Sequence, residues 1–360
     1  MPELPEVETI RRTLTPRLVG RTIKRVEVRT PKFIVGASPE EFRGAVEGAR
    51  IDSLGRRGKF LIINLEYPAD SAGPGVHPRG DAPPSPGVHP RGAPPSPGVH
   101  PCGAPPSPGV HPCGRRSTDG PDPVHGSTAG VRAGHEPDPT GLPGDIVVHL
   151  KMAGQLVWCC PGEDLGPTRT KHTHVVFHLD DGHELRYLDL RHFGRVYFPP
   201  GNAADPVLSR ALRTIQTLGP EPREGGLEWE SFRGKLARRQ ARIKPLLLDQ
   251  AFVAGLGNIY ADESLFRAKV HPLRRASTLT DAEAAAVYEA MREVIGEAID
   301  RHGTSVRDYV DGEGRRGMFA EELRAYGRTG QPCPRCGEPI ERLMIGGRSS
   351  HFCPKCQPRT

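Results

Sequence analysis

Four cysteines near the C-terminal end form two C-x-x-C pairs, "CPRC" and "CPKC", and these residues are Cys333, Cys336, Cys353 and Cys356. Sixteen residues separate the two pairs. Two pairs at this spacing are typical of zinc ribbons, in which four thiolates hold the metal tetrahedrally. A redox pair and an iron–sulfur site are the alternatives. We expect one structural zinc ion per chain, at the base of a β-hairpin whose tip is "GGRSSH".

A second stretch that could do chemistry is "LLLDQAFVAGLGNIYADESLFRAKVHP". It predicts a helix, a turn that contains Gly255 and Gly257, and a second helix with Asn258 at its N-terminus. The first N–H groups of a helix have no intrahelical partner, so they can bind a phosphate. A plain helical hairpin is the alternative. The stretch therefore indicates DNA binding only in combination with other motifs.

The charge balance is compatible with a polyanionic partner. The chain has 49 Lys and Arg against 43 Asp and Glu, which gives a net charge of +6. This alone is a weak indication, because many basic proteins bind no nucleic acid. No apolar run approaches the roughly 20 residues that span a bilayer, and the N-terminus lacks the apolar core of a signal peptide. We expect a cytoplasmic protein without membrane contact.

The elements that must position these residues divide into two kinds. A helix is predicted directly after the first residues, with Pro16 and Gly20 marking its end, and a tight turn, "GRRG", is predicted to present Lys59 just beyond it. Strand-like runs follow on both sides of residues 68–142, which predicts a β-sandwich with the helix packed on it. The apolar stripe of that helix consists of Val7, Ile10, Leu14 and Leu18.

The pattern becomes helical from Pro206 onward, and the cysteine module closes the chain. Helices are predicted in "LEWESFRGKLARR", "IKPLLLDQ" and "NIYADESLFRA", and over residues 281–301. Thr280 is expected to cap the last of these helices, with Glu283 completing a capping box.

Residues 68–142 have a different composition. "SPGVHPRGAPP" recurs there with a period of eleven, and 19 of the 39 prolines fall in this range. Such a composition cannot bury a core, so we expect a disordered or extended insertion. The expected domains are residues 1–67 with 143–200, residues 206–325, and residues 326–360.

Several motifs occur in the order that they have in formamidopyrimidine-DNA glycosylases. These are "PELPEVET", "RRGKF", "HLKMAG", "DLRHFG", "GLGNIYADE" and the cysteine module. The chain resembles this family everywhere except residues 68–142, and "LPEVET" favours it over the related endonuclease VIII branch. The resemblance implies an α+β fold, with a β-sandwich and leading helix, a helical helix-two-turns-helix domain and a zinc hairpin.

The resemblance also implies an activity. A bacterial, nucleoid-associated monomer would excise 8-oxoguanine and formamidopyrimidines from double-stranded DNA and cleave the strand by β,δ-elimination, in base excision repair. Two alternatives stay open. One is an endonuclease VIII-like enzyme for oxidised pyrimidines, and the other is a non-catalytic protein that binds damaged DNA.

By resemblance, the catalytic residues are Pro2, Glu3, Lys59 and Arg348. Removal of Met1 would leave Pro2 with a secondary amine, and an α-amino group has a pKa of roughly 8, so a useful fraction is neutral at pH 7. That amine can attack the sugar C1′ and form an iminium, which acidifies the C2′ proton. Glu3 is expected to be the general acid. Lys59 would assist β-elimination and Arg348 would support δ-elimination.

The resemblance also implies residues that contact the DNA and the lesion. Met152, Arg191 and Phe193 match the side chains that fill the gap left by an everted base. The loop "GTSVRDYVDGEGRRGMF" resembles the family's lesion-covering loop. Phosphate contacts are expected from His172, Arg191, Arg239 and Asn258. Lesion contacts are expected from Glu6, Lys244, Thr304 and Tyr309.

Overall fold

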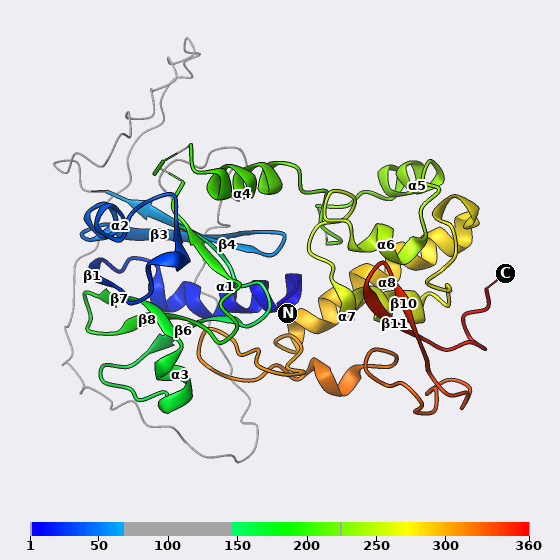
Figure 1. Ribbon diagram of the computed structural model, residues 1–360. Helices are drawn as coiled ribbons and strands as arrows, with labels where there is room; N and C mark the ends of the chain where they lie inside the picture. Colours follow the sequence, from blue (N-terminus) through cyan, green and yellow to red (C-terminus); the bar gives the residue numbers. More distant parts are fainter. Residues whose placement is uncertain (1, 68–145, 200, 203, 224, 360) are drawn as a thin grey trace, which may run out of the picture. The chain divides into compact units, whose positions relative to one another are not determined.

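The computed structural model describes residues 2–67, 146–199, 201–202, 204–223 and 225–359 (Figure 1). The predicted insertion at 68–142 lies outside the described residues, so the structure does not test it. None of the described helices is both long enough and apolar enough to cross a membrane.

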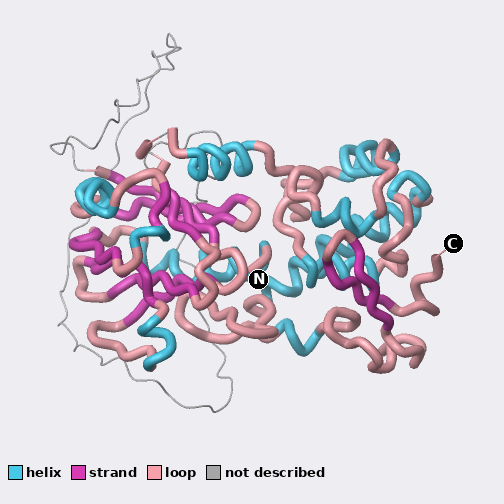
Figure 2. Tube along the Cα trace, viewed as in Figure 1, coloured by secondary structure: helices cyan, strands magenta, loops and turns pink. Residues whose placement is uncertain are grey.

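The first part of the chain is mainly β-structure (Figure 2). Its strands form one sheet in the order β2-β9-β5-β4-β3 and another in the order β1-β7-β8-β6. Its helices are α1 Leu4–Leu18, α2 Pro39–Val46 and α3 Pro167–Lys171. Its strands are β1 Ile23–Val28, β2 Ile34–Val35, β3 Arg50–Arg57, β4 Phe60–Glu66, β5 Ile146–His149, β6 Gly154–Cys159, β7 Thr173–Leu179, β8 Glu184–Asp189 and β9 Arg195–Tyr197.

One apolar core joins the two sheets and α1. It contains Leu54 and Val148 from one sheet, Val26 and Phe177 from the other, and Leu14 from α1. The predicted stripe of α1 is fully buried, because spacings of three and four place its apolar residues on one helix face. The predicted sandwich with a leading helix is therefore confirmed.

Two local predictions about this part are wrong in detail. Pro16 lies inside α1, which continues to Leu18. A proline so close to the helix end removes only one helical hydrogen bond, and buried Leu18 keeps the last turn packed. The turn between β3 and β4 is not "GRRG", since Arg57 pairs with Phe60. The hairpin turn consists of Gly58 and Lys59, so Lys59 lies in the turn itself.

The second part is helical. Its helices are α4 Pro206–Gln216, α5 Trp229–Ala237, α6 Ile243–Leu248, α7 Asn258–Arg267 and α8 Asp281–Asp300. A separate core joins α5 to α8, with Phe232, Leu247, Tyr260 and Met291 among its buried members. The Thr280 hydroxyl accepts from the N–H of Glu283, and the Glu283 carboxylate accepts from the N–H of Thr280, so the predicted capping box is confirmed.

The chain ends in an antiparallel hairpin of β10 Glu341–Ile345 and β11 Arg348–Phe352. Gly346 and Gly347, both at positive φ, form its turn, so Arg348 follows the tip directly. A small apolar cluster that includes Phe266 of α7, Ile340 and Cys353 holds the hairpin module against the helical part.

Candidate active site

The N-terminal end of α1 is fixed against the loop that leads into α7. The N–H of Leu4 donates to the carbonyl of Gly255 at 3.0 Å. The carboxylate of buried Glu3 accepts from the N–H of Gly257 at 2.6 Å and from that of Ile259 at 3.0 Å. The expectation that this helix N-terminus offers free N–H groups to a phosphate is therefore wrong for Gly257 and Ile259, because the Glu3 carboxylate binds both of their N–H groups.

The glycines of this loop allow α1 to approach. A Cβ on Gly257 would lie 2.4 Å from the carboxyl group of Glu3. A Cβ on Gly255, whose φ is +92°, would lie 2.5 Å from the side chain of Leu4. Only glycine fits such contacts without displacing its neighbours. The group that approaches the turn predicted at Gly255 and Gly257 is therefore the chain's own N-terminal segment.

Glu6 lies one helical turn from Glu3 and is held by three donors. It accepts from the backbone N–H of Glu3 at 2.7 Å, from that of Thr304 at 2.8 Å, and from the hydroxyl of Tyr260. Burial, together with the negative charge of Glu3, raises the pKa of Glu6 to about 7. Glu6 therefore ties α1, α7 and the segment after α8 together.

Two of the expected catalytic residues, Glu3 and Lys59, are buried. The ammonium of Lys59 donates to the carbonyl of Leu256 at 2.6 Å. Burial lowers the pKa of Lys59, with the charges of Glu3 and Glu6 opposing that shift. Burial also raises the pKa of Glu3, against the opposing charge of Lys59. Glu3 is thus a better proton donor near neutral pH than an exposed glutamate, and Lys59 loses its proton more easily than an exposed lysine.

A cavity of about 540 Å³ brings most of the expected residues together. Its wall contains the two residues that precede α1 and residues from the segment between β5 and β6, from α7, from the segment after α8 and from β11. The predicted site residues among them are Pro2, Glu3, Met152, Arg191, Asn258, Thr304, Tyr309 and Arg348.

A smaller cavity of about 340 Å³ carries Lys59 in its wall and shares Asn258 and Arg348 with the first. Lys151 and Arg210 add two more cationic side chains to it. His149 also lines this cavity, and burial lowers its pKa to about 3, so the ring is neutral at pH 7. The positive charge of this wall suits a phosphate of bound DNA.

The three side chains expected to enter the DNA base stack, those of Met152, Arg191 and Phe193, are exposed. Met152 is 43% exposed and Phe193 is 52% exposed, which is uncommon for large apolar residues. The guanidinium of Arg191 lies 5.5 Å from the centre of the Phe193 ring. Exposed apolar groups beside a cation are the chemistry that a base-stack wedge needs.

Lys244 does not line either of these cavities. It is fully buried, and its ammonium lies 2.6 Å from Asp262 and donates to the carbonyl of Ser349 at 2.6 Å. Asp262 also pairs with His351 at 2.9 Å. Lys244 thus joins α6 and α7 to β11, where it contacts the residue that follows Arg348.

Two expected phosphate contacts lie away from the cavities. Arg239 is exposed just beyond the end of α5, and His172 is half-buried at the end of α3. Arg239 and His172 line neither of the two cavities. They could contact only DNA phosphates that lie outside these cavities.

A buried ion cluster fixes the hairpin that carries Lys59. Arg56 donates to both oxygens of Glu221, at 2.9 and 2.8 Å, and to Glu8 at 3.0 Å. Glu221 also accepts from the N–H of Gly58 at 2.7 Å. Although burial alone would raise the pKa of Glu221, the Arg56 guanidinium and these hydrogen bonds lower it overall.

Sequence patterns did not reveal Glu221, Tyr260 or Asp262. Tyr260 and Asp262 stand inside "NIYADE", and Glu221 stands inside "LGPEP", so each belongs to a motif-like stretch. A buried ionic or hydroxyl partner leaves no periodic signal. For Glu221 and Asp262, a role could have been suspected only because acidic residues are rarely buried without a partner.

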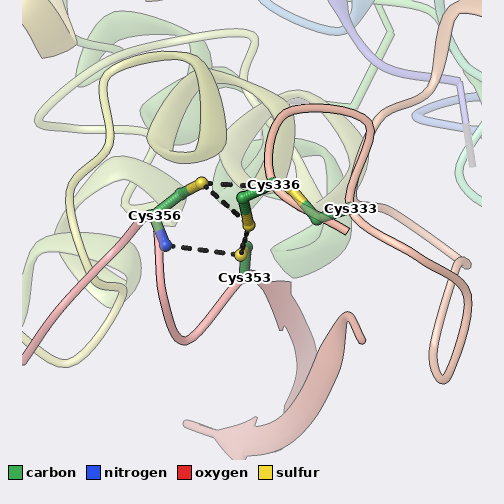
Figure 3. A group of neighbouring side chains, drawn as sticks. All are labelled: Cys333, Cys336, Cys353 and Cys356. Carbon is green, nitrogen blue, oxygen red and sulfur yellow. Dashed lines mark hydrogen bonds between the residues drawn. The ribbon is translucent and has the colours of Figure 1, made fainter. Parts of the chain in front are cut away.

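The four cysteines converge as predicted (Figure 3). Their Sγ atoms all lie within 4.8 Å of one another, with separations of 3.4, 3.5 and 4.0 Å between three of the pairs. Zinc–sulfur bonds of about 2.3 Å in a tetrahedron place the sulfur atoms about 3.8 Å apart. The four side chains fit one structural zinc ion. Because they would fill all four coordination positions of the metal, a substrate could not bind to it.

Comparisons with known proteins agree with this arrangement. The family model "Formamidopyrimidine-DNA glycosylase N-terminal domain" matches residues 1–82 and 134–196. The model "Formamidopyrimidine-DNA glycosylase H2TH domain" matches residues 218–310. The model "Zinc finger found in FPG and IleRS" matches residues 330–359.

The chain is 40% identical over 357 residues to the formamidopyrimidine-DNA glycosylase of Pelotomaculum thermopropionicum, covering 99% of both chains. Among solved structures it is similar to a Lactococcus lactis FPG mutant bound to Fapy-dG-containing DNA, with 28% identity, a TM-score of 0.69, and coverage of 99% and 100% of the two chains. A MutM structure in complex with carbocyclic 8-oxo-G-containing DNA has 28% identity, a TM-score of 0.68 and the same coverage. The chain therefore belongs to the formamidopyrimidine-DNA glycosylase family.

Proposed function

We propose that Pro2 is the nucleophile with which this chain excises oxidised purines from DNA and then cleaves the strand. The chain is a formamidopyrimidine-DNA glycosylase with AP lyase activity, and it acts in base excision repair. The relatives bound to Fapy-dG and 8-oxo-G DNA support formamidopyrimidines and 8-oxoguanine as its substrates. Bacterial cytoplasm, at the nucleoid, is the proposed place of action, because DNA is the substrate.

One observation supports this proposal most strongly: Pro2 and Glu3 line the same cavity, and Glu3 is held there by two backbone donors. Once Met1 is removed, the neutral Pro2 nitrogen attacks C1′ of the damaged nucleotide and the bond from C1′ to the base breaks. Glu3, whose pKa is raised, supplies a proton to the sugar ring oxygen or the departing base.

After the attack the nitrogen loses its one proton. Its lone pair then forms the double bond to C1′ while the C1′–O4′ bond breaks and O4′ takes up a proton, so the ring-opened adduct is a cationic iminium. The electron pair of the C2′–H bond moves toward this cation, the proton leaves, and the bond from C3′ to the 3′ phosphate oxygen breaks. We propose that Lys59 assists this β-elimination from the hairpin turn. Arg348 holds the phosphate during the following δ-elimination, from its position in both cavities.

Binding of DNA is proposed to use the exposed wedge and the cationic wall. Met152, Arg191 and Phe193 replace the stacking of the everted base, and Asn258, His172 and Arg239 contact phosphates. Thr304 and Tyr309 line the cavity beside Glu6 and contact the lesion. Lys244 acts through its contact with Ser349, as a positioning residue for the zinc hairpin.

The domain boundaries belong to the same proposal. Residues 1–67 and 143–200 form the catalytic domain, residues 206–325 the helical DNA-binding domain, and residues 326–360 the zinc hairpin. The ranges matched by the three family models support this division. Residues 68–142 are proposed to be an insertion, since a family model matches on both sides of residues 83–133.

Single-turnover cleavage of duplexes with different lesions tests the substrate class. The duplexes carry 8-oxoguanine, a formamidopyrimidine, thymine glycol or no lesion, in one sequence context. We expect cleavage of the first two at rates at least tenfold above thymine glycol. Faster cleavage of thymine glycol would indicate an enzyme for oxidised pyrimidines, and tight binding without cleavage of any duplex would indicate a non-catalytic protein.

A further inference from the structure

Three imidazoles meet on the β-sandwich, apart from the zinc hairpin. His172 follows α3, His174 lies in β7, and His192 lies in the loop between β8 and β9. One ring nitrogen from each of the three lies within 4.8 Å of the others. The ring centres are 4.7 Å apart for His174 and His192, and 5.9 Å apart for His172 and His192.

The surroundings of His174 fix its tautomer in the form that a metal requires. Its Nε2 lies 3.0 Å from the carbonyl of Asp189, and a carbonyl can only accept, so Nε2 carries the proton. Its Nδ1 then presents a lone pair, which accepts from the hydroxyl of Thr30 at 3.0 Å. A backbone carbonyl behind the distal nitrogen is the usual support of a metal-bound histidine. Stacking on Phe33, with ring centres 4.0 Å apart, holds the ring in place.

His192 already has a cation at its Nδ1. The ammonium of exposed Lys32 donates to this nitrogen at 2.9 Å, so Nδ1 carries the lone pair and faces a cation. Lys32 is a long, flexible side chain that can move away when another cation takes its place. His172 is half-buried, and its ring lies edge-on to those of His174 and His192, with centres 6.4 and 5.9 Å away.

We infer that His172, His174 and His192 form a second metal site, which binds one imidazole-preferring divalent ion such as Zn²⁺. Zinc–nitrogen bonds of about 2.1 Å need ring nitrogens about 3.4 Å apart, so nitrogens that now lie within 4.8 Å must approach by up to about 1.4 Å. Three protein ligands leave the fourth position to water, unlike the closed four-cysteine site. The inference does not rest on the proposed DNA repair activity, but His172 is shared with the proposed phosphate contacts, so metal binding is measured without DNA.

Two matched variants test this site. His192 and His302 both have a φ of 59°, a conformation that asparagine tolerates. His192→Asn removes one ligand, and His302→Asn makes the same change at an exposed histidine outside the cluster. His172→Asn is a second removal that does not touch the buried ring of His174. Thermal unfolding without added metal establishes that each variant is folded.

Untagged full-length protein that retains its structural zinc is titrated with ZnCl₂ in a calorimeter at pH 7.5. Histidines between residues 68 and 145 are present in every variant, so zinc that they bind contributes equally to each titration. We expect wild type and His302→Asn to bind one additional equivalent at least tenfold more tightly than His192→Asn and His172→Asn. Indistinguishable titrations of all four proteins would overturn the inference.

Discussion

Replacement of Glu221 by glutamine tests whether the buried ion cluster positions the catalytic hairpin. Glu221 is the group that joins Arg56 in β3 to the N–H of Gly58, next to Lys59. The side chains of Arg56 and Glu221 are both only 4% exposed, so water cannot replace a lost partner. The amide of glutamine keeps one accepting oxygen and turns the other acceptor into a donor that faces Arg56.

The expected loss follows from the bonds that this change removes. Deleting one partner of a buried ion pair costs about 3–5 kcal/mol when the other charge is left alone. Here Glu8 still accepts from Arg56, at 3.0 Å, so the guanidinium keeps one carboxylate. The replaced oxygen accepts from Arg56 and also from half-exposed Arg223 at 3.0 Å, so one buried and one partly exposed charge-assisted hydrogen bond are lost. A repulsive donor is added as well, and we expect a total cost of about 2–3 kcal/mol.

Urea unfolding followed by circular dichroism measures the free energy of unfolding, and single-turnover cleavage of an abasic duplex measures the effect on Lys59. We expect the cleavage rate of Glu221→Gln to fall at least tenfold, because small misplacements of a catalytic group are costly. Glu66→Gln is the control: it breaks the exposed pair with Arg50 at the opposite end of the same hairpin. That pair should contribute less than about 1 kcal/mol and leave cleavage unchanged. Equal effects of the two variants would refute the reasoning.

Three further predictions concern the zinc, the acid and the pH dependence. Cys333→Ser should lose zinc by metal analysis and bind DNA more weakly, because the hairpin that carries Arg348 depends on the metal; a variant that retained one zinc would contradict the ribbon assignment. Glu3→Gln should lose base excision by about 10²-fold or more in single turnover, yet still cleave an abasic duplex, where no base has to leave; equal losses on both duplexes would remove Glu3 as the acid. The pKa of Glu6 is raised from 4.5 to about 7, so the folded protein holds this proton more tightly than the unfolded chain. The stability that Glu6 contributes is complete below pH 4.5 and is lost as the pH rises through 7, so Glu6→Gln should flatten the decline of the urea midpoint over this window, and an unchanged slope would contradict the shift.

Much of the fold was predictable because its signals are local. The apolar stripe of α1, the capping box of α8 and the two C-x-x-C pairs each lie within a short stretch and fix an element or a metal site. The strand-like runs on both sides of residues 68–142 predicted the β-sandwich. The convergence of the four cysteines was predictable because two C-x-x-C pairs at this spacing are typical of a zinc ribbon.

The contacts between distant segments were not predictable from such signals. The N–H groups at the start of α7 were expected to be free. Only the fold shows that Glu3, more than 250 residues earlier in the chain, accepts from those of Gly257 and Ile259. Lys244 matched a motif but is buried against Asp262. A pairing of this kind depends on which surfaces meet in three dimensions, and a single sequence carries no periodicity that records it.

Reductive trapping tests the role of Pro2 most directly. The protein is mixed with 8-oxoguanine DNA and borohydride, and the covalent complex is digested and examined by mass spectrometry. An iminium is reducible, so we predict one stable adduct at the nitrogen of Pro2 in the chain that has lost Met1. A variant with extra residues before Met1, in which this nitrogen is an amide, should give no adduct. Attachment at a lysine, or tight DNA binding without attachment, would contradict the assignment of Pro2 as the nucleophile.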